Sequence, residues 1–137
     1  MVDKVTPAQR SSMMAAVKNK NTQPEIIVRK RVFAAGFRYR LHVRKRSSTP
    51  DLILPRYRVA VFVHGCFWHG HDCPKGKLPA TNRKFWRNKI SKNIERDNRA
   101  VKDLHSDGWK VVTVWSCQIE DGIENLLALL KRRRKKF

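Results

Sequence analysis

Residues 58–73 read RVAVFVHGCFWHGHDC, an apolar run that passes directly into histidine, cysteine, glycine and aromatic residues. The run Arg58–Val63 is rich in valine, which predicts a central strand buried on both faces. Gly65 to Pro79 contains glycine, proline, histidine and cysteine without a period, so we expect a folded loop there. The residues with chemical function therefore stand where a buried strand ends.

Helices and further strands are predicted on both sides of this strand. The sequence Thr22-Gln23-Pro24-Glu25 is a capping box that starts a helix, and Gly36 closes that helix. The other expected elements are, in chain order, a helix over Ala8–Val17, strands over Arg38–Val43, Asp51–Leu54 and Arg58–Val63, a helix over Asn82–His105, a strand over Trp109–Trp115 and a helix over Ile119–Leu130. This order predicts a single α/β domain over residues 1–137, with a mixed sheet flanked by helices. We expect residues 131–137 to form a basic, flexible tail.

The composition indicates a globular protein with a polyanionic partner. The 137 residues fit one domain, and 31 lysines and arginines against 11 acids give a net charge of +20. Hydrophobic residues make up 41% of the chain, which excludes full disorder. No apolar run approaches the roughly 18 residues of a membrane span, and no signal peptide is evident. Three cysteines favour a reduced compartment, so we expect a cytoplasmic protein. A ribosomal-type protein that binds nucleic acid would have a similar composition and net charge.

The first chemical cluster combines every cysteine of the chain with a histidine. Cys66, His71 and Cys73 have the spacing C-x4-H-x-C, and Cys117 follows some forty residues later. Together they can supply a Cys3His tetrahedral zinc site. Three buried cysteines beside an unrelated histidine are the alternative. His69 lies between two of the candidate ligands and could take the place of His71.

The second chemical cluster is a carboxylate with two histidines. Asp51 stands at the start of a strand, a common metal position in nucleases, where Mg²⁺ would polarise a phosphoryl oxygen and activate water. His64 and His69 follow the apolar strand, and a histidine can act as general base near neutral pH. Asp51 could instead be an ordinary turn residue after Pro50. Glu25 is explained by the capping box alone, unless the start of its helix faces Asp51.

Aromatic residues are concentrated around these clusters. Five of the twelve aromatic residues fall within 25 positions, namely Phe62, Phe67, Trp68, Phe85 and Trp86. Exposed aromatic side chains beside cations suit stacking on bases or wedging into a duplex. A small hydrophobic cluster packed around zinc is the alternative interpretation.

Several separated motifs resemble one family. His64–Cys73 closely resembles the signature of the very-short-patch repair (Vsr) endonucleases. Similar matches, in the order and at the distances that the family uses, are Pro50-Asp51, Pro79–Ile90, then Asn93, Arg96 and Asp97, and Val114–Cys117. The likeness extends from about Thr6 to about Leu130.

The resemblance implies a restriction-endonuclease-like fold and a reaction. The family nicks DNA on the strand that bears the thymine of a T:G mismatch, which arises when 5-methylcytosine is deaminated. By this likeness Asp51 is the Mg²⁺ ligand, with the main-chain carbonyl of Val63 as the second. His69 is the catalytic base, and His64 and Glu25 position water or phosphate.

The resemblance also implies the remaining contacts and partners. Cys66, His71, Cys73 and Cys117 form the structural zinc site. Phe67, Trp68 and Trp86 are the aromatic wedge, Lys89 and Asn93 contact base edges, and residues 1–20, with Met14, form an arm that contacts DNA. The implied partners are double-stranded DNA with a T:G mismatch, a MutL-type mismatch-repair protein and a repair polymerase, with no membrane, in the nucleoid of a prokaryotic cytoplasm.

Three departures limit what the likeness carries over. The strand Val59–His64 lacks the acid-x-Lys pair of many restriction-like nucleases, so the sequence fits a histidine variant of that site. Gly70 stands where the family often has histidine. The basic loop Arg44–Thr49 differs, so flanking-sequence specificity is not transferred. A non-catalytic, zinc-containing module that binds DNA or RNA is the alternative function, because it would not need Asp51, His64 and His69 to converge.

Overall fold

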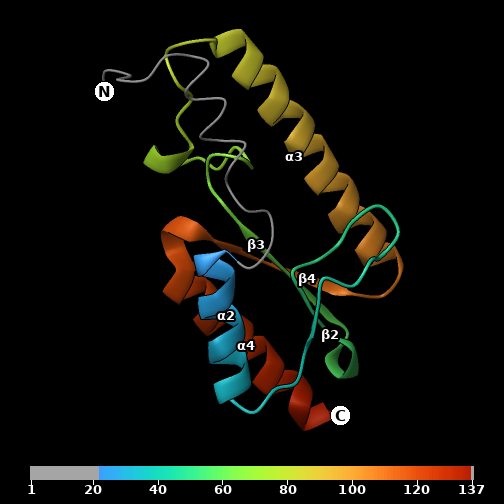
Figure 1. The fold of residues 1–137 in the computed structure, drawn as a ribbon. Coiled ribbons are helices and arrows are strands. Elements are labelled where there is room, and N and C mark those ends of the chain that lie inside the picture. The colour runs from blue at the N-terminus through green and yellow to red at the C-terminus, as the bar shows by residue number, and fades with distance from the viewer. Residues whose placement is uncertain (1–21, 137) are drawn as a thin grey trace.

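The computed structural model describes residues 22–136, which form a four-stranded mixed sheet with helices on both faces (Figure 1). The strands are β1 (Arg40–Leu41), β2 (Leu52–Leu54), β3 (Val59–His64) and β4 (Lys110–Trp115), and they lie in the order β1-β2-β3-β4. The helices are α2 (Gln23–Ala34), α3 (Arg83–Ser106) and α4 (Ile119–Lys136). The predicted α/β domain with a mixed sheet is confirmed for this part of the chain.

The pairing of β3 positions the functional residues. β2 runs antiparallel to β3, and β4 runs parallel to it, after the crossover through α3. The parallel register ends with His64 opposite Trp115, so residues that follow β3 and β4 emerge at the same edge of the sheet. This arrangement brings the loop after His64 next to Cys117.

The two faces of β3 enter two separate cores, as its continuous apolar run predicts. Val59 and Val61 pack with α2 and α4, which lie side by side in Figure 1, whereas Ala60 and Phe62 pack with α3. The remaining core residues on the first side include Val28, Val32, Ile123, Leu126 and Leu130, and those on the second include Ala100, Leu104 and Trp109. Burial on both faces makes β3 a fixed support for the residues at its end.

Two predictions about elements are corrected. The expected strand over Arg38–Val43 is only Arg40–Leu41, because His42 has a φ of 51° and turns the chain out of the sheet. The expected flexible tail is wrong for residues 131–136, which extend α4. Arg133 there donates a hydrogen bond to the carbonyl of Tyr57, and the Arg134 guanidinium lies 4.5 Å from the ring centre of Phe37. These contacts hold the basic end of the helix against the core.

The predicted helix over Ala8–Val17, and the DNA-contacting arm over residues 1–20 with Met14, lie outside the described residues. Among the helices of residues 22–136, none combines the length and apolar character needed to cross a membrane.

Candidate active site at the end of the central strands

A buried carboxyl group, that of Glu25, and a half-buried one, that of Asp51, meet beside β3. Glu25 lies in the first turn of α2, where its backbone N–H donates to the Thr22 hydroxyl at 3.4 Å, and the residue is only 1% exposed. Asp51 precedes β2, and its Oδ2 accepts a 2.7 Å hydrogen bond from the backbone N–H of Val63. Glu25, His42 and Asp51 each offer a ligand atom within 4.8 Å of the other two. The start of α2 therefore faces Asp51, which is the condition that a metal or water-holding role for Glu25 requires.

The environment of Asp51 favours a cation. The pKa of Asp51 is raised to about 7, chiefly by burial and also by the nearby Glu25 carboxyl, while the Val63 N–H and His42 act in the opposite direction. Two carboxyl groups in contact disfavour the doubly ionised state unless a positive charge lies between them. A hard divalent ion with oxygen ligands would supply that charge. The donor set therefore fits Mg²⁺, which Asp51 and Glu25 would hold.

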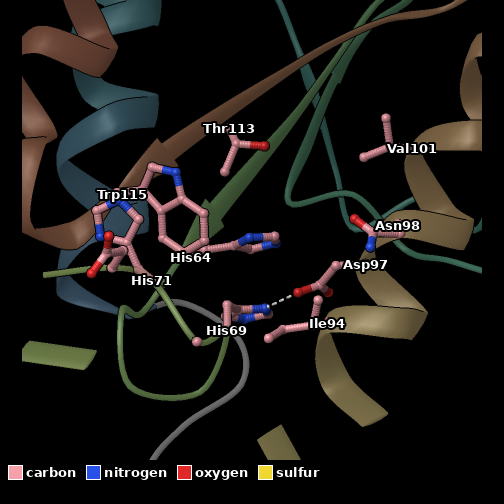
Figure 2. Close-up of a pocket in the computed structure, with 11 residues that line it drawn as sticks. His64, His69, His71, Ile94, Asp97, Asn98, Val101, Thr113 and Trp115 are labelled. Atoms are coloured by element: carbon pink, nitrogen blue, oxygen red, sulfur yellow. Dashed lines mark hydrogen bonds and ion pairs between the residues drawn. The ribbon is translucent and has the colours of Figure 1, made fainter. Parts of the chain in front are cut away.

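The two predicted catalytic histidines come together on the other side of β3. The rings of His64 and His69 are stacked, with centroids 3.6 Å apart and planes within 3° (Figure 2). The Nδ1 of His69 lies 2.6 Å from Oδ2 of Asp97, which projects from α3. The pair lines a cavity of about 280 Å³ that also contacts Thr113 and Trp115.

Burial gives the two rings different protonation behaviour. The pKa of His64 is lowered to about 4, chiefly by burial and also by the neighbouring His69, while Asp97 opposes the shift. His64 is therefore neutral near pH 7. Carboxylate oxygens only accept hydrogen bonds, so Nδ1 of His69 donates to Asp97. That bond fixes the ring and directs its second nitrogen away from Asp97.

The carboxyl group of Asp51 and the histidines are linked through consecutive residues of β3. Asp51 binds the N–H of Val63, and His64 is the next residue. The backbone N–H and C=O of one residue in an extended strand point to the same side. The Val63 carbonyl is therefore directed toward the side on which Asp51 lies. Chemistry that needs both groups would take place at this end of β3.

The four predicted zinc ligands also converge. Cys66, His71, Cys73 and Cys117 each offer a ligand atom within 4.8 Å of the other three, and Sγ of Cys117 is 3.4 Å from Nδ1 of His71. All three cysteines are free thiols. His71 therefore belongs to this cluster, while His69 faces Asp97. The separations and the soft thiolate donors fit a closed tetrahedral zinc site.

The thiols of this cluster influence one another. Burial raises the pKa of Cys66, but hydrogen bonds from Ser116 and from Cys117 outweigh it and lower the value to about 6. Burial and the neighbouring thiols Cys66 and Cys73 raise the pKa of Cys117 to about 11. One thiol thus ionises readily and suppresses ionisation of the next.

The aromatic residues form a compact cluster whose members differ in exposure. Phe67 lies 5.3 Å from both Trp68 and Trp86, measured between ring centres, and the two tryptophans are 5.9 Å apart. Trp86 is only 4% exposed, whereas Phe67 and Trp68 are half-buried. Asn93 donates a 2.9 Å hydrogen bond to the Trp68 carbonyl and so supports the loop. Trp86 is thus the base of the cluster, and Phe67 and Trp68 form its accessible side.

Three residues at the site were not assigned a role from the sequence. Asp97 was part of a motif but gave no sign that it would meet His69, 28 positions earlier. Trp115 stacks on His71 at 4.2 Å and contacts His64 edge-on at 5.3 Å, so it separates the cysteine cluster from the stacked histidines. His42 stood at the end of an expected strand, and only the structure shows that it reaches Glu25.

The arrangement defines a class of protein. A pair of carboxyl groups that favours a divalent ion and a histidine oriented by a carboxylate suit metal-assisted phosphodiester hydrolysis. They occur here in a domain with a net charge of +20, which suits a nucleic-acid substrate. The fold and the site are those of a nuclease.

Comparison with known proteins specifies the family. The sequence model of the family described as DNA mismatch endonuclease Vsr matches residues 2–75. Over 121 residues the chain is 44% identical to the type II nicking enzyme V.NmeAIP of Neisseria meningitidis serogroup A, covering 88% of this chain and 86% of that protein. Over 119 residues it is 38% identical to the DNA mismatch endonuclease Vsr of Escherichia coli K12, covering 87% and 76%. The chain belongs to the DNA mismatch endonuclease Vsr family and is an endonuclease that acts on DNA. The predicted resemblance is confirmed, and the restriction-endonuclease-like fold is consistent with it.

Proposed function

We propose that this protein nicks duplex DNA on the thymine-bearing strand beside a T:G mismatch and so initiates very-short-patch repair. Membership of the Vsr family supports the reaction class. The observation that carries the proposal is the placement of the Asp51–Glu25 carboxyl pair and the His69–Asp97 pair on the two sides of the same end of β3. A module that only binds nucleic acid does not need this placement.

The residues that would hold Mg²⁺ are Asp51 and the main-chain carbonyl of Val63, with Glu25 beside them. Bound there, the ion would polarise a phosphoryl oxygen and stabilise the charge that develops in phosphodiester hydrolysis. The raised pKa of Asp51, about 7, supports this assignment, because a buried carboxyl group with a second one beside it gains most from a cation.

His69 is proposed as the general base. Its Nδ1–H donates to Asp97, so Nε2 carries the lone pair that can accept a proton from water. As that proton is taken up, the Asp97 carboxylate stabilises the resulting imidazolium. His64 stacks on His69 and remains neutral near pH 7, so it holds the ring in place without adding a competing charge. Glu25 and His64 would also position water or phosphate.

The cysteine cluster is proposed to bind one structural Zn²⁺. Cys66, His71 and Cys73 lie in the loop after β3, and Cys117 lies after β4. A four-ligand site has no open position for substrate, so its role would be to hold this loop in place. The loop carries both the aromatic pair and His69, which makes the geometry of the site dependent on the zinc.

The mismatch would be recognised by a wedge formed by Phe67 and Trp68 and supported by Trp86. A T:G wobble pair stacks less well than a matched pair, so separating the adjacent base step costs less there. Exposed Lys89, on α3, and Met14, in the proposed N-terminal arm, would contact the same duplex. Cooperation with a MutL-type protein and a repair polymerase, in the nucleoid of a prokaryotic cytoplasm, is part of the proposal.

Single-turnover nicking of paired duplexes tests the function. The substrates differ only in one T:G or T:A pair, and the labelled strand is varied. We expect a Mg²⁺-dependent nick in the thymine-bearing strand of the T:G duplex. Tight binding of the mismatch without cleavage, in wild type and in Asp51→Ala alike, would favour the binding module.

A further inference from the structure

His42 occupies a strained position directly beside the carboxyl pair. It follows the last residue of β1 and has a φ of 51°, a left-handed conformation that side chains other than glycine rarely adopt. Its backbone N–H donates to the carbonyl of Asp51 at 3.3 Å. Such backbone strain persists only where surrounding contacts enforce it, and it is concentrated at functional sites.

The imidazole of His42 reaches both oxygens of Glu25. Its Nε2 lies 3.2 Å from Oε1 and 3.1 Å from Oε2. Carboxylate oxygens only accept hydrogen bonds, so Nε2–H is the donor. Arg29 adds a 3.1 Å contact to Oε2 from one turn along α2. Glu25 is 1% exposed and the His42 side chain is 17% exposed, so water is largely excluded from these contacts.

His42 binds both residues of the pair, the Glu25 carboxyl group through its side chain and the main-chain carbonyl of Asp51 through its backbone N–H. Glu25 and Asp51 repel one another when both are ionised, and His42 and Arg29 both hold Glu25 in place against that repulsion. A donor shared between both Glu25 oxygens fixes the plane of that carboxylate, while the backbone bond fixes the start of β2. A cation site whose ligands are held in place loses less entropy when the ion binds.

We propose that His42 is a positioning residue that holds Glu25 against Asp51 and thereby sets the affinity of this carboxyl pair for a divalent cation. The inference rests on the proposed function for the identity of the site. It assigns His42 no contact with DNA or with the reacting phosphate.

Two measurements on the full-length, zinc-loaded protein test the proposal. The first is a Mn²⁺ titration in which the free ion is followed by electron paramagnetic resonance, without DNA. The second is the Mg²⁺ concentration that gives half-maximal single-turnover nicking of a T:G duplex. The variants are His42→Ala, which removes the donor, and His42→Gln, which keeps an N–H donor. His105→Ala, at an exposed position near the end of α3, is the matched control.

We expect His42→Ala to weaken Mn²⁺ binding and to raise the Mg²⁺ requirement by about tenfold, which corresponds to about 1.4 kcal/mol. His42→Gln should recover most of the affinity, and His105→Ala should match the wild type. Unchanged cation binding in His42→Ala would overturn the proposal. So would a loss in His42→Gln as large as in His42→Ala, accompanied by lower thermal stability in both. If the wild type binds Mn²⁺ but does not nick the mismatch, the proposed function fails while the His42 result still stands.

Discussion

Replacing Asp51 with asparagine should abolish nicking and stabilise the metal-free protein. The change is nearly isosteric, and the asparagine oxygen can still accept the hydrogen bond from Val63 N–H. It removes an ionisable group whose pKa is raised to about 7 by burial and by Glu25. Above that pH the folded wild type carries an ionised Asp51 that is partly removed from water and lies beside Glu25. In the unfolded chain the same carboxylate is fully hydrated.

The size of the expected stability gain follows from the difference between the pKa of Asp51 in the folded and in the unfolded protein. A rise from 3.8 to about 7 corresponds to at most about 4 kcal/mol of destabilisation at alkaline pH. Because Asp51 lies beside a second carboxyl group, we expect Asp51→Asn to gain about 1–4 kcal/mol at pH 8 without added Mg²⁺. A gain of 1 kcal/mol raises the melting temperature of a domain of this size by roughly 3–5 °C.

The stability difference between Asp51→Asn and the wild type should change with pH in one direction. Between pH 4 and 7 the folded state holds a proton on Asp51 that the unfolded state has released, so this group's contribution to stability falls as pH rises. The difference between Asp51→Asn and wild type should therefore grow from pH 4 to 7 and then level off. His64, whose folded pKa is lowered to about 4, contributes in the opposite direction, but equally in both proteins, so it cancels in the difference.

The assay is thermal or urea unfolding of both proteins from pH 4 to 8.5, with and without Mg²⁺. Added Mg²⁺ should stabilise the wild type and have much less effect on Asp51→Asn. A variant that is less stable than wild type at pH 8 without Mg²⁺ would refute the reasoning about the carboxyl pair. Equal stabilisation of both proteins by Mg²⁺ would place the ion elsewhere.

The other site residues give distinguishable outcomes. Trp68→Ala should weaken binding to a T:G duplex by one to two powers of ten, with little effect on a matched duplex, as gel-shift titration would show; equal weakening of both would remove it from recognition. Trp86→Ala should instead lower stability by about 3–5 kcal/mol in urea unfolding, because it is buried at 4% exposure; an unchanged midpoint would contradict its packing role. Cys117→Ser should reduce zinc below one ion per chain by elemental analysis and lower the melting temperature; a full complement of zinc would exclude it as a ligand. Asp97→Asn should slow single-turnover nicking by at least tenfold without loss of mismatch binding, and an unchanged rate would separate Asp97 from the base.

Much of the fold could be predicted from the sequence because the patterns that indicate it lie within short segments. The valine-rich run of β3 requires burial on both faces, and the capping box at Thr22 starts α2 where expected. The candidate metal ligands include every cysteine, so composition and spacing suggested a Cys3His site, whereas the choice of His71 over His69 came from the family resemblance. These features depend on neighbouring residues or on rare residue types.

The remaining features depend on contacts between distant segments. The basic end of α4 looked like a solvated tail, but Arg133 binds the carbonyl of Tyr57, a contact across 76 positions. Asp97 reaches His69 only because α3 crosses beside the loop after β3. His42 turns out of β1 with a positive φ, which no preference of a single residue would suggest.

The most direct test of the central claim is strand-resolved, single-turnover cleavage of a T:G duplex with Mg²⁺. The strands carry different labels, and the same duplex with T:A in place of T:G is the control. We predict one nick, in the thymine-bearing strand beside the mismatch, that requires Mg²⁺ and is lost in both Asp51→Asn and His69→Ala although each still binds the duplex. Cleavage of both duplexes at equal rates, or nicking that persists in Asp51→Asn, would contradict the assignment of a mismatch-directed nuclease whose chemistry depends on the carboxyl pair.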